Sequence, residues 1–146
     1  MSESFQVSRL ADDESVLLIE LFDPAWIYYH QAIDQAFALI AQTDAQQYII
    51  LQSPPVLPKE QPLPHFRQTA MKWQQHPQLQ AMVIVLPEKY TSSFFNSISQ
   101  VLTRMILPHY VQKSFYVRTF EEALTRIRAL RTQLSRMISQ NLPSQA

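Results

Sequence analysis

The sequence predicts one α/β domain with a mixed, mostly parallel sheet of about five strands, which opens with a hairpin and carries about four helices. Two observations lead to this fold class. Short apolar segments of strand length alternate with longer segments in which apolar residues recur every three or four positions. In addition, the 146 residues contain no internal repeat and no linker, so residues 1–146 are expected to form a single domain.

The first segments predict a hairpin followed by a helix. Residues 4–10 alternate apolar and polar side chains, residues 15–22 are nearly all apolar, and a short polar turn separates them. We expect two antiparallel strands there. Asp23 is a good N-cap residue and Pro24 suits the first helical turn, so the next helix is expected to start at Asp23 and to end near Thr43.

The middle of the chain predicts two further strands, separated by a proline-rich loop and a short helix. Residues 47–53 and 81–86 are apolar runs of strand length. Between them, residues 53–64 hold five prolines, which excludes a regular helix or a central strand. A short helix is expected over residues 64–75, and the pair His76-Pro77 ends it.

The last third predicts a helix, a strand and a long final helix. A helix is expected over residues 90–107 and a strand over 114–118. Thr119 and Glu122 have the spacing of a capping box, so the final helix is expected to begin there and to run to about Ile138. Because strands and helices alternate after the hairpin, the later strands should run parallel with right-handed crossovers.

Two residue types are missing altogether, which excludes several functional classes. The chain has no glycine, although about ten would be expected at the ordinary frequency. This excludes the P-loop, the dinucleotide-binding glycine fingerprint and the G-x-S-x-G nucleophile elbow. The absence of cysteine excludes disulfides, thiolate catalysis and cysteine-ligated metals. Few residues should then adopt a positive φ, and the candidates are Asp12, Asp13, Asp44 and Asn96.

The charges balance in total but are divided along the chain. Residues 1–60 hold nine acidic and two basic side chains, whereas residues 61–146 hold three acidic and ten basic ones. This division favours attraction between the two halves of one domain, and a basic face for an anionic partner or a second copy is the alternative. A pI of about 6.9 argues against nucleic-acid binding.

The expected location is the cytoplasm. The first residues lack the basic and apolar regions of a secretory signal. The longest apolar runs are far shorter than the roughly 20 residues of a membrane span, so no integral membrane association is expected.

The second half of the chain resembles a known family. The segments that carry the resemblance are His76-Pro77, the strand 81–86 with the helix after it, Phe115–Val117 and Thr119–Leu124. They are similar to the closing β-α-β-α segment of the STAS superfamily, the fold of bacterial anti-sigma-factor antagonists. The resemblance covers roughly residues 5–130 and implies a STAS-like scaffold that serves as an interaction module.

The regulatory feature of that family has no counterpart here. The family places a phosphorylatable serine or threonine at the start of the helix after the third strand. In this chain Ser53 lies at the strand end instead, and no serine or threonine occurs between it and Thr69. A phosphorylation switch is therefore not expected.

No group of residues identifies a catalytic or metal site. The histidines His30, His65, His76 and His109 are never spaced three or four positions apart, so surface or capping roles are expected, and the alternative is that the fold brings distant histidines together. Glu20 lies inside an apolar strand, and an exposed strand edge is the simplest interpretation. No carboxylate pair has the fixed spacing that acid–base catalysis needs. We therefore expect no catalytic residue, no metal and no cofactor.

Aromatic residues gather where helices follow strands, which indicates a possible ligand cleft. Ligands of parallel α/β folds bind outside the carboxyl ends of the strands, where helix starts and the proline-rich loop lie. A small apolar or lipid-like ligand would fit there, and ordinary core packing is the alternative. The candidate cleft residues are Trp26, Tyr29, Leu57, Leu63, Phe66, Tyr90 and Phe94.

The final helix gives the clearest functional indication. Its apolar residues recur at spacings of three and four from Phe120 to Met137, close to a heptad period. A helix of about twenty residues extends about 30 Å, so its end at 131–140 should project beyond strands of about 17 Å. We call this row of apolar residues along one side of the helix the apolar seam. If the seam is exposed, it favours binding of a partner, and packing of the helix on its own domain is the alternative. The candidate interface residues are Leu130, Arg131, Leu134, Met137 and Ile138.

The favoured interpretation is a non-enzymatic regulatory or protein-interaction module of STAS-like type. Its partner would be another protein, a second copy of the chain, or both. The alternative is a carrier domain for a small apolar ligand or lipid, and an enzyme ranks third.

Overall fold

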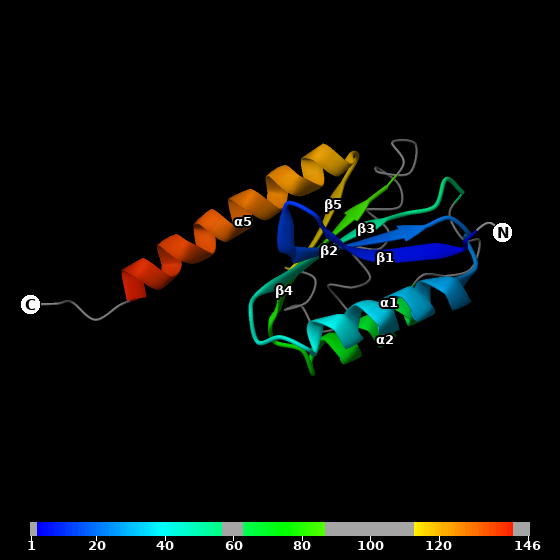
Figure 1. The fold of residues 1–146 in the computed structure, drawn as a ribbon, viewed down its shortest axis with the longest axis horizontal. Helices are drawn as coiled ribbons and strands as arrows, with labels where there is room; N and C mark the ends of the chain where they lie inside the picture. Colours follow the sequence, from blue (N-terminus) through cyan, green and yellow to red (C-terminus); the bar gives the residue numbers. More distant parts are fainter. Residues whose placement is uncertain (1–2, 57–62, 87–112, 142–146) are drawn as a thin grey trace, which may run out of the picture.

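The computed structural model describes residues 3–56, 63–86 and 113–141, and for residues 63 and 137–141 it describes the backbone alone. In these residues the chain forms a five-stranded sheet with helices on both of its faces (Figure 1). The expected helix over 90–107 lies outside the described residues, so three of the four expected helices are seen.

The five strands lie in the sheet in the order in which they occur along the chain. β1 and β2 form an antiparallel hairpin, and each later strand runs parallel to the one before it. The strands are β1 (Phe5–Leu10), β2 (Asp13–Leu21), β3 (Gln47–Gln52), β4 (Leu79–Val85) and β5 (Ser114–Val117). The predicted mixed, mostly parallel sheet with an opening hairpin is confirmed.

The helices divide between the two faces of the sheet. α1 (Trp26–Ile40) and α2 (Leu63–Trp73) pack beside each other on one face, and α5 (Phe120–Asn141) packs on the other (Figure 1). Both faces of the central strands are therefore buried, which explains why these strands are apolar without alternation. In β3, for example, Ile49 and Leu51 contact the α1–α2 layer, whereas Ile50 contacts the α5 layer.

The start of α1 differs from the expectation. The helix begins at Trp26, and its N-cap residue is Ala25, two residues after the expected cap; the Ala25 side chain makes no capping hydrogen bond. Asp23 instead accepts a hydrogen bond from the backbone N–H of Ala25 at 2.9 Å. The carboxylate thus closes a turn ahead of the helix, a role that aspartate also performs well.

The start of α5 follows the predicted capping box. The hydroxyl oxygen of Thr119 accepts a hydrogen bond from the N–H of Glu122 at 3.1 Å. The carboxylate of Glu122 accepts in return from the N–H of Arg118 at 3.0 Å, one residue earlier than in the standard motif. Two backbone donors at this helix end are therefore satisfied by side chains.

The turns within the described ranges of the chain contain no residue in the left-handed region. No described residue has a positive φ, so Asp12, Asp13 and Asp44 do not adopt one, and Asn96 lies outside the described residues. Side chains stabilise the turns instead: the hydroxyl of Thr43 accepts from the N–H of Ala45 at 3.1 Å. The expectation of few such positions is confirmed.

Two ion pairs join the acidic first half of the chain to its basic second half. Lys72 of α2 pairs with Asp34 of α1. Arg131 of α5 pairs with Asp13 of β2 at 2.6 Å. Some acidic side chains of the first half therefore attract basic side chains of the second half inside the domain, as expected.

We predict that Thr119→Ala lowers the free energy of unfolding by about 1 kcal/mol, because it removes the cap of α5. Urea unfolding measures the change. The matched control is Thr125→Ala in the same helix, whose hydroxyl bonds only to the carbonyl of Glu121 and which should stay within about 0.5 kcal/mol of the wild type. Equal effects of the two substitutions would contradict the capping role.

Candidate functional site

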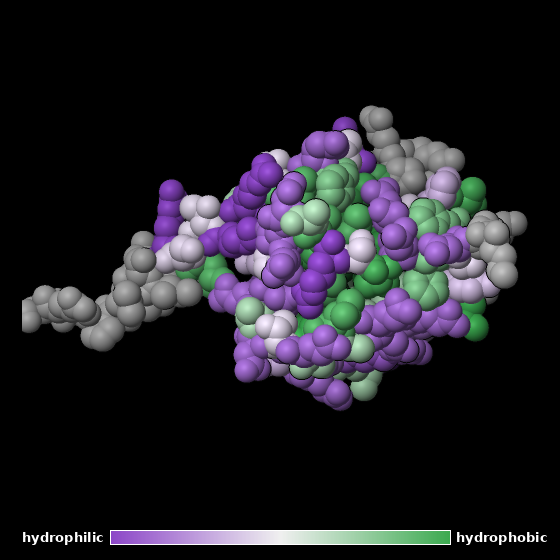
Figure 2. Space-filling view, in the orientation of Figure 1, coloured by the Kyte–Doolittle hydropathy of each residue, from purple (hydrophilic) through white to green (hydrophobic). Residues whose placement is uncertain are grey.

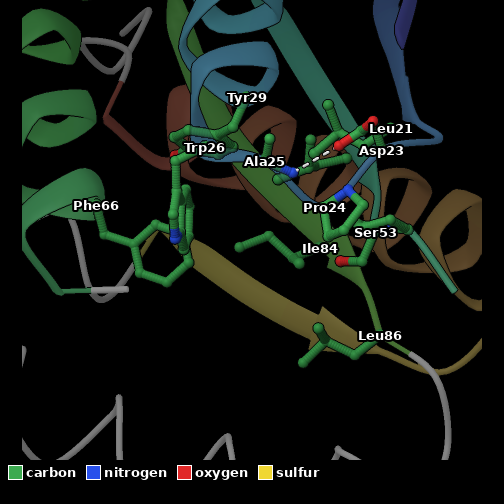
Figure 3. Close-up of a pocket in the computed structure, with 12 residues that line it drawn as sticks. Leu21, Asp23, Pro24, Ala25, Trp26, Tyr29, Ser53, Phe66, Ile84 and Leu86 are labelled. Atoms are coloured by element: carbon green, nitrogen blue, oxygen red, sulfur yellow. Dashed lines mark hydrogen bonds between the residues drawn. The ribbon is translucent and has the colours of Figure 1, made fainter. Parts of the chain in front are cut away.

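A small apolar pocket lies at the carboxyl ends of β2, β3 and β4, beside the start of α1 (Figure 3). The strands contribute Leu21, Leu51 and Ile84, and the chain directly after β4 contributes Leu86. Figure 3 shows Trp26 and Phe66 at one side of the pocket and Leu86 at the other. The free volume is about 40 Å³, room for only a few atoms.

Aromatic rings build the helical side of this pocket. The ring of Trp26 meets Tyr29 edge-on at a centroid distance of 5.1 Å and Phe66 edge-on at 5.9 Å. The ring of His65 stacks on Trp26 at 4.1 Å with an interplanar angle of 6°. Edge-to-face and offset contacts of this kind hold rings in defined orientations. The wall formed by α1 and α2 is therefore a set of mutually packed rings.

The structure brings together three of the seven predicted cleft residues. Trp26, Tyr29 and Phe66 all line the pocket. Leu57, Tyr90 and Phe94 lie outside the described residues, and of Leu63 only the backbone is described. The sequence prediction missed the strand-end residues, such as Leu51 and Leu86, because an apolar residue at the end of a strand has the same pattern as one in the core.

Two histidines far apart in the sequence lie in contact beside the pocket. Nε2 of His30 on α1 is 2.7 Å from Nδ1 of His65 on α2. The packing of α1 on α2 thus brings together two half-buried histidines that are 35 positions apart in the sequence. A second polar contact lies nearby, where the hydroxyls of Tyr29 and Thr69 are 2.7 Å apart.

The surroundings favour the neutral forms of His30 and Tyr29. Burial lowers the pKa of His30, the positive charges of His65 and Lys72 lower it further, and Asp34 acts in the opposite direction. Burial also raises the pKa of Tyr29 well above its usual value, so its hydroxyl stays protonated. The described residues contain no group of three or more histidine, aspartate or glutamate side chains placed to hold a metal ion.

Two other residues considered from the sequence lie close to this region. Glu20 is half-buried on β2, a strand with neighbours on both sides, so the expectation of an exposed edge is wrong. Ser53 follows β3, lines the pocket and donates its backbone N–H to the carbonyl of Val85 at 3.1 Å.

The predicted interface lies on the second half of α5. Ala123 and Ile127 are buried against the sheet, whereas Leu130 and Leu134 are only half-buried. Figure 1 shows the helix leaving the sheet and projecting from the body of the domain. For Met137 and Ile138 only the helical backbone is described, so the seam can be followed structurally as far as Leu134.

Arg131 acts within its own domain. Its guanidinium group donates to the carboxylate of Asp13 at 2.6 Å and to the hydroxyl of Ser15 at 2.7 Å, and it lies 5.2 Å above the ring of Tyr48. Burial alone would raise the pKa of Asp13, but the hydrogen bonds from Ser15 and Arg131, with the charge of Arg131, lower it overall. This residue therefore ties α5 to the hairpin at the point where the helix leaves the sheet.

Comparison of the chain with protein-family models, with curated proteins and with solved structures gave no match. The STAS-like resemblance therefore stays a prediction. In the described residues, no helix has the length and apolarity that crossing a membrane requires.

We predict that the stability of the protein falls as the pH drops below about 6.5, because the unfolded chain takes up a proton at His30 more readily than the folded chain does. Urea midpoints at about pH 7.5 and about pH 5.5 measure this loss. His30→Gln should reduce it. Lys72→Gln should reduce it less, because it removes one positive charge near His30 and leaves Asp34. If His30→Gln lost as much stability on acidification as the wild type does, the pH dependence could not be assigned to His30.

Proposed function

We propose that this chain is a non-enzymatic protein-interaction module of STAS-like type that forms a homodimer through the projecting end of α5. The observation that carries the proposal is the apolar seam of α5, which continues where the helix no longer lies on the sheet. Along this seam the residues pass from buried Ile127 to half-buried Leu130 and Leu134. A leucine that is only partly buried on a projecting helix gains stability when a partner covers the rest of its surface.

The length of α5 supports this role. The helix has 22 residues, which corresponds to about 33 Å, whereas β5 beside it has only four residues. Its packing against the sheet is mainly on β3, β4 and β5, and Arg131 adds a polar contact with the start of β2. A helix needs far fewer residues than this to cover such a sheet, so the extra turns serve something other than the monomer core.

The charges of the projecting segment favour a second copy as the partner. Residues 131–141 contain two charged side chains, Arg131 and Arg136, and no acidic one. Because Arg131 is neutralised by Asp13 of its own chain, two copies of this segment meet with little repulsion. A two-fold axis would place the same seam on both sides, as in most homodimers.

Arg131, one of the candidate interface residues, makes no contact with the second copy in the proposed dimer. The ion pair with Asp13 occupies that guanidinium inside the domain. In the proposed dimer Arg131 fixes the direction of α5, and the apolar residues after it make the contact.

We predict that Leu134→Lys converts a dimer into a folded monomer. Two half-buried leucine side chains leave the interface, and covering the exposed part of each is worth about 0.5–1 kcal/mol, so the dissociation constant should rise at least about fivefold. Sedimentation equilibrium measures it. The matched control is Gln133→Lys, which adds the same charge at an exposed neighbouring position and should leave the dimer intact.

Circular dichroism shows whether the Leu134→Lys variant remains folded. A wild type that is monomeric at high micromolar concentration would overturn the proposal. So would a variant that loses its fold, since Leu134 would then belong to the monomer core.

A further inference from the structure

The hairpin is covered less completely on one face of the sheet than on the other. On the first face α1 packs on β1 and β2, and Leu17 and Ile19 of β2 are fully buried. On the opposite face α5 packs mainly on β3, β4 and β5, and Leu18 of β2, which packs on that face, is only half-buried. Because β2 has a neighbouring strand on each side, the exposure of Leu18 reflects an incomplete cover above the hairpin.

A groove lies between α5 and the hairpin on this face. Its volume is about 300 Å³, roughly ten times the volume of one water molecule in the liquid, so it has room for apolar side chains. Figure 2 shows apolar surface over the hairpin, beside the more polar surface of α5. We call this feature the hairpin groove, and its apolar lining comes from Leu10, Ala11, Val16, Phe120, Leu124 and Ile127.

The projecting end of α5, residues 131–141, continues the side of the helix that contacts the sheet. Leu134 lies seven residues after Ile127, and an α-helix drifts only about 20° over seven residues. Ile127 is buried against the sheet, so half-buried Leu134 faces the same way, at a level where Figure 1 shows none of the described strands next to the helix. The seam therefore suits a sheet face that the described part of its own chain does not supply there.

We propose that the projecting end of α5 in each copy lies in the hairpin groove of the other copy. This inference rests on the homodimer proposed above and names the surface that receives the seam. A two-fold axis perpendicular to the sheets sets the two α5 helices side by side and antiparallel, brings the sheets end to end, and carries each projecting end over the other hairpin. Both seams then face a sheet and both grooves are filled, whereas a contact of seam with seam leaves both grooves open.

The charges support a second copy as the occupant of the groove. Arg136 is exposed and is the only charged side chain after Arg131, whereas Asp12 is exposed and lines the groove. Neither Arg136 nor Asp12 has an ion-pair partner in the part of the chain that the structure describes. Of the other lining charges, Asp13 is paired with Arg131, and Arg128 opposes Arg136. Asp12 can therefore pair with Arg136 of the second copy, and apolar contact supplies most of the attachment.

Sedimentation equilibrium of a groove variant tests the proposal. Ala11→Lys places a long, positively charged side chain at an exposed lining position, where it obstructs the groove and repels Arg136. The dissociation constant should therefore rise at least about fivefold. The matched control is Ala129→Lys, the same change at an exposed position of α5 outside the groove, which should dimerise like the wild type. Circular dichroism confirms that both variants are folded.

A mixture of two variants tests the exchange itself. Leu134→Glu brings a negative charge to the groove that Asp12 lines, so this variant alone should dimerise weakly, as Ala11→Lys alone should. In a heterodimer of the two variants one contact is unchanged, and in the other the introduced carboxylate meets the introduced ammonium group. The mixture should therefore form dimers at least about fivefold more tightly than either variant alone.

The outcomes separate this proposal from the homodimer on which it rests. A monomeric wild type overturns both. If Leu134→Lys dissociates the dimer and Ala11→Lys leaves it intact, the homodimer stands and the groove is overturned, because the seams then meet each other. The groove is also overturned if Ala11→Lys and Ala129→Lys weaken the dimer equally, or if the mixture of Ala11→Lys and Leu134→Glu dimerises no more tightly than its components.

Discussion

The structure depends on one constraint, the burial of β3 and β4 on both faces. Side chains such as Ile50 and Val83 face α5, while Ile49 and Met82 face α1 and α2. Polar side chains without partners are costly at such positions, so the strands must be apolar throughout and a layer of helices must cover each face. Only the ends of the strands escape this requirement, and the apolar pocket lies at such an end.

Much of the fold follows from local patterns in the sequence. Doubly buried strands are recognisable as short apolar runs, and α5 is recognisable from the capping pair Thr119 and Glu122. The start of α1 was misplaced because an aspartate can either cap a helix or close the turn before it. Local sequence does not decide between these two uses, since both satisfy a backbone N–H.

The candidate sites were less predictable than the fold. Trp26, Tyr29 and Phe66 could be grouped because helix starts lie at the carboxyl edge of a parallel sheet. The contact between His30 and His65 could not be foreseen, because it depends on how α1 and α2 are set against each other. The same holds for Arg131, whose partners Asp13 and Ser15 lie on a hairpin at the other end of the chain. Contacts between residues far apart in the sequence can be identified only once the tertiary structure is known.

The glycine-free turns have a consequence for how this sequence can vary. Where φ is positive, a residue with a Cβ is strained, so replacing a glycine at such a position destabilises the fold. No described residue here occupies that region, and the chain contains no glycine. At turn positions such as Ala45, a new side chain therefore meets no steric barrier from the backbone itself. The turns among the described residues should tolerate substitutions more readily than turns that hold glycine at a positive φ, while the doubly buried strands should not.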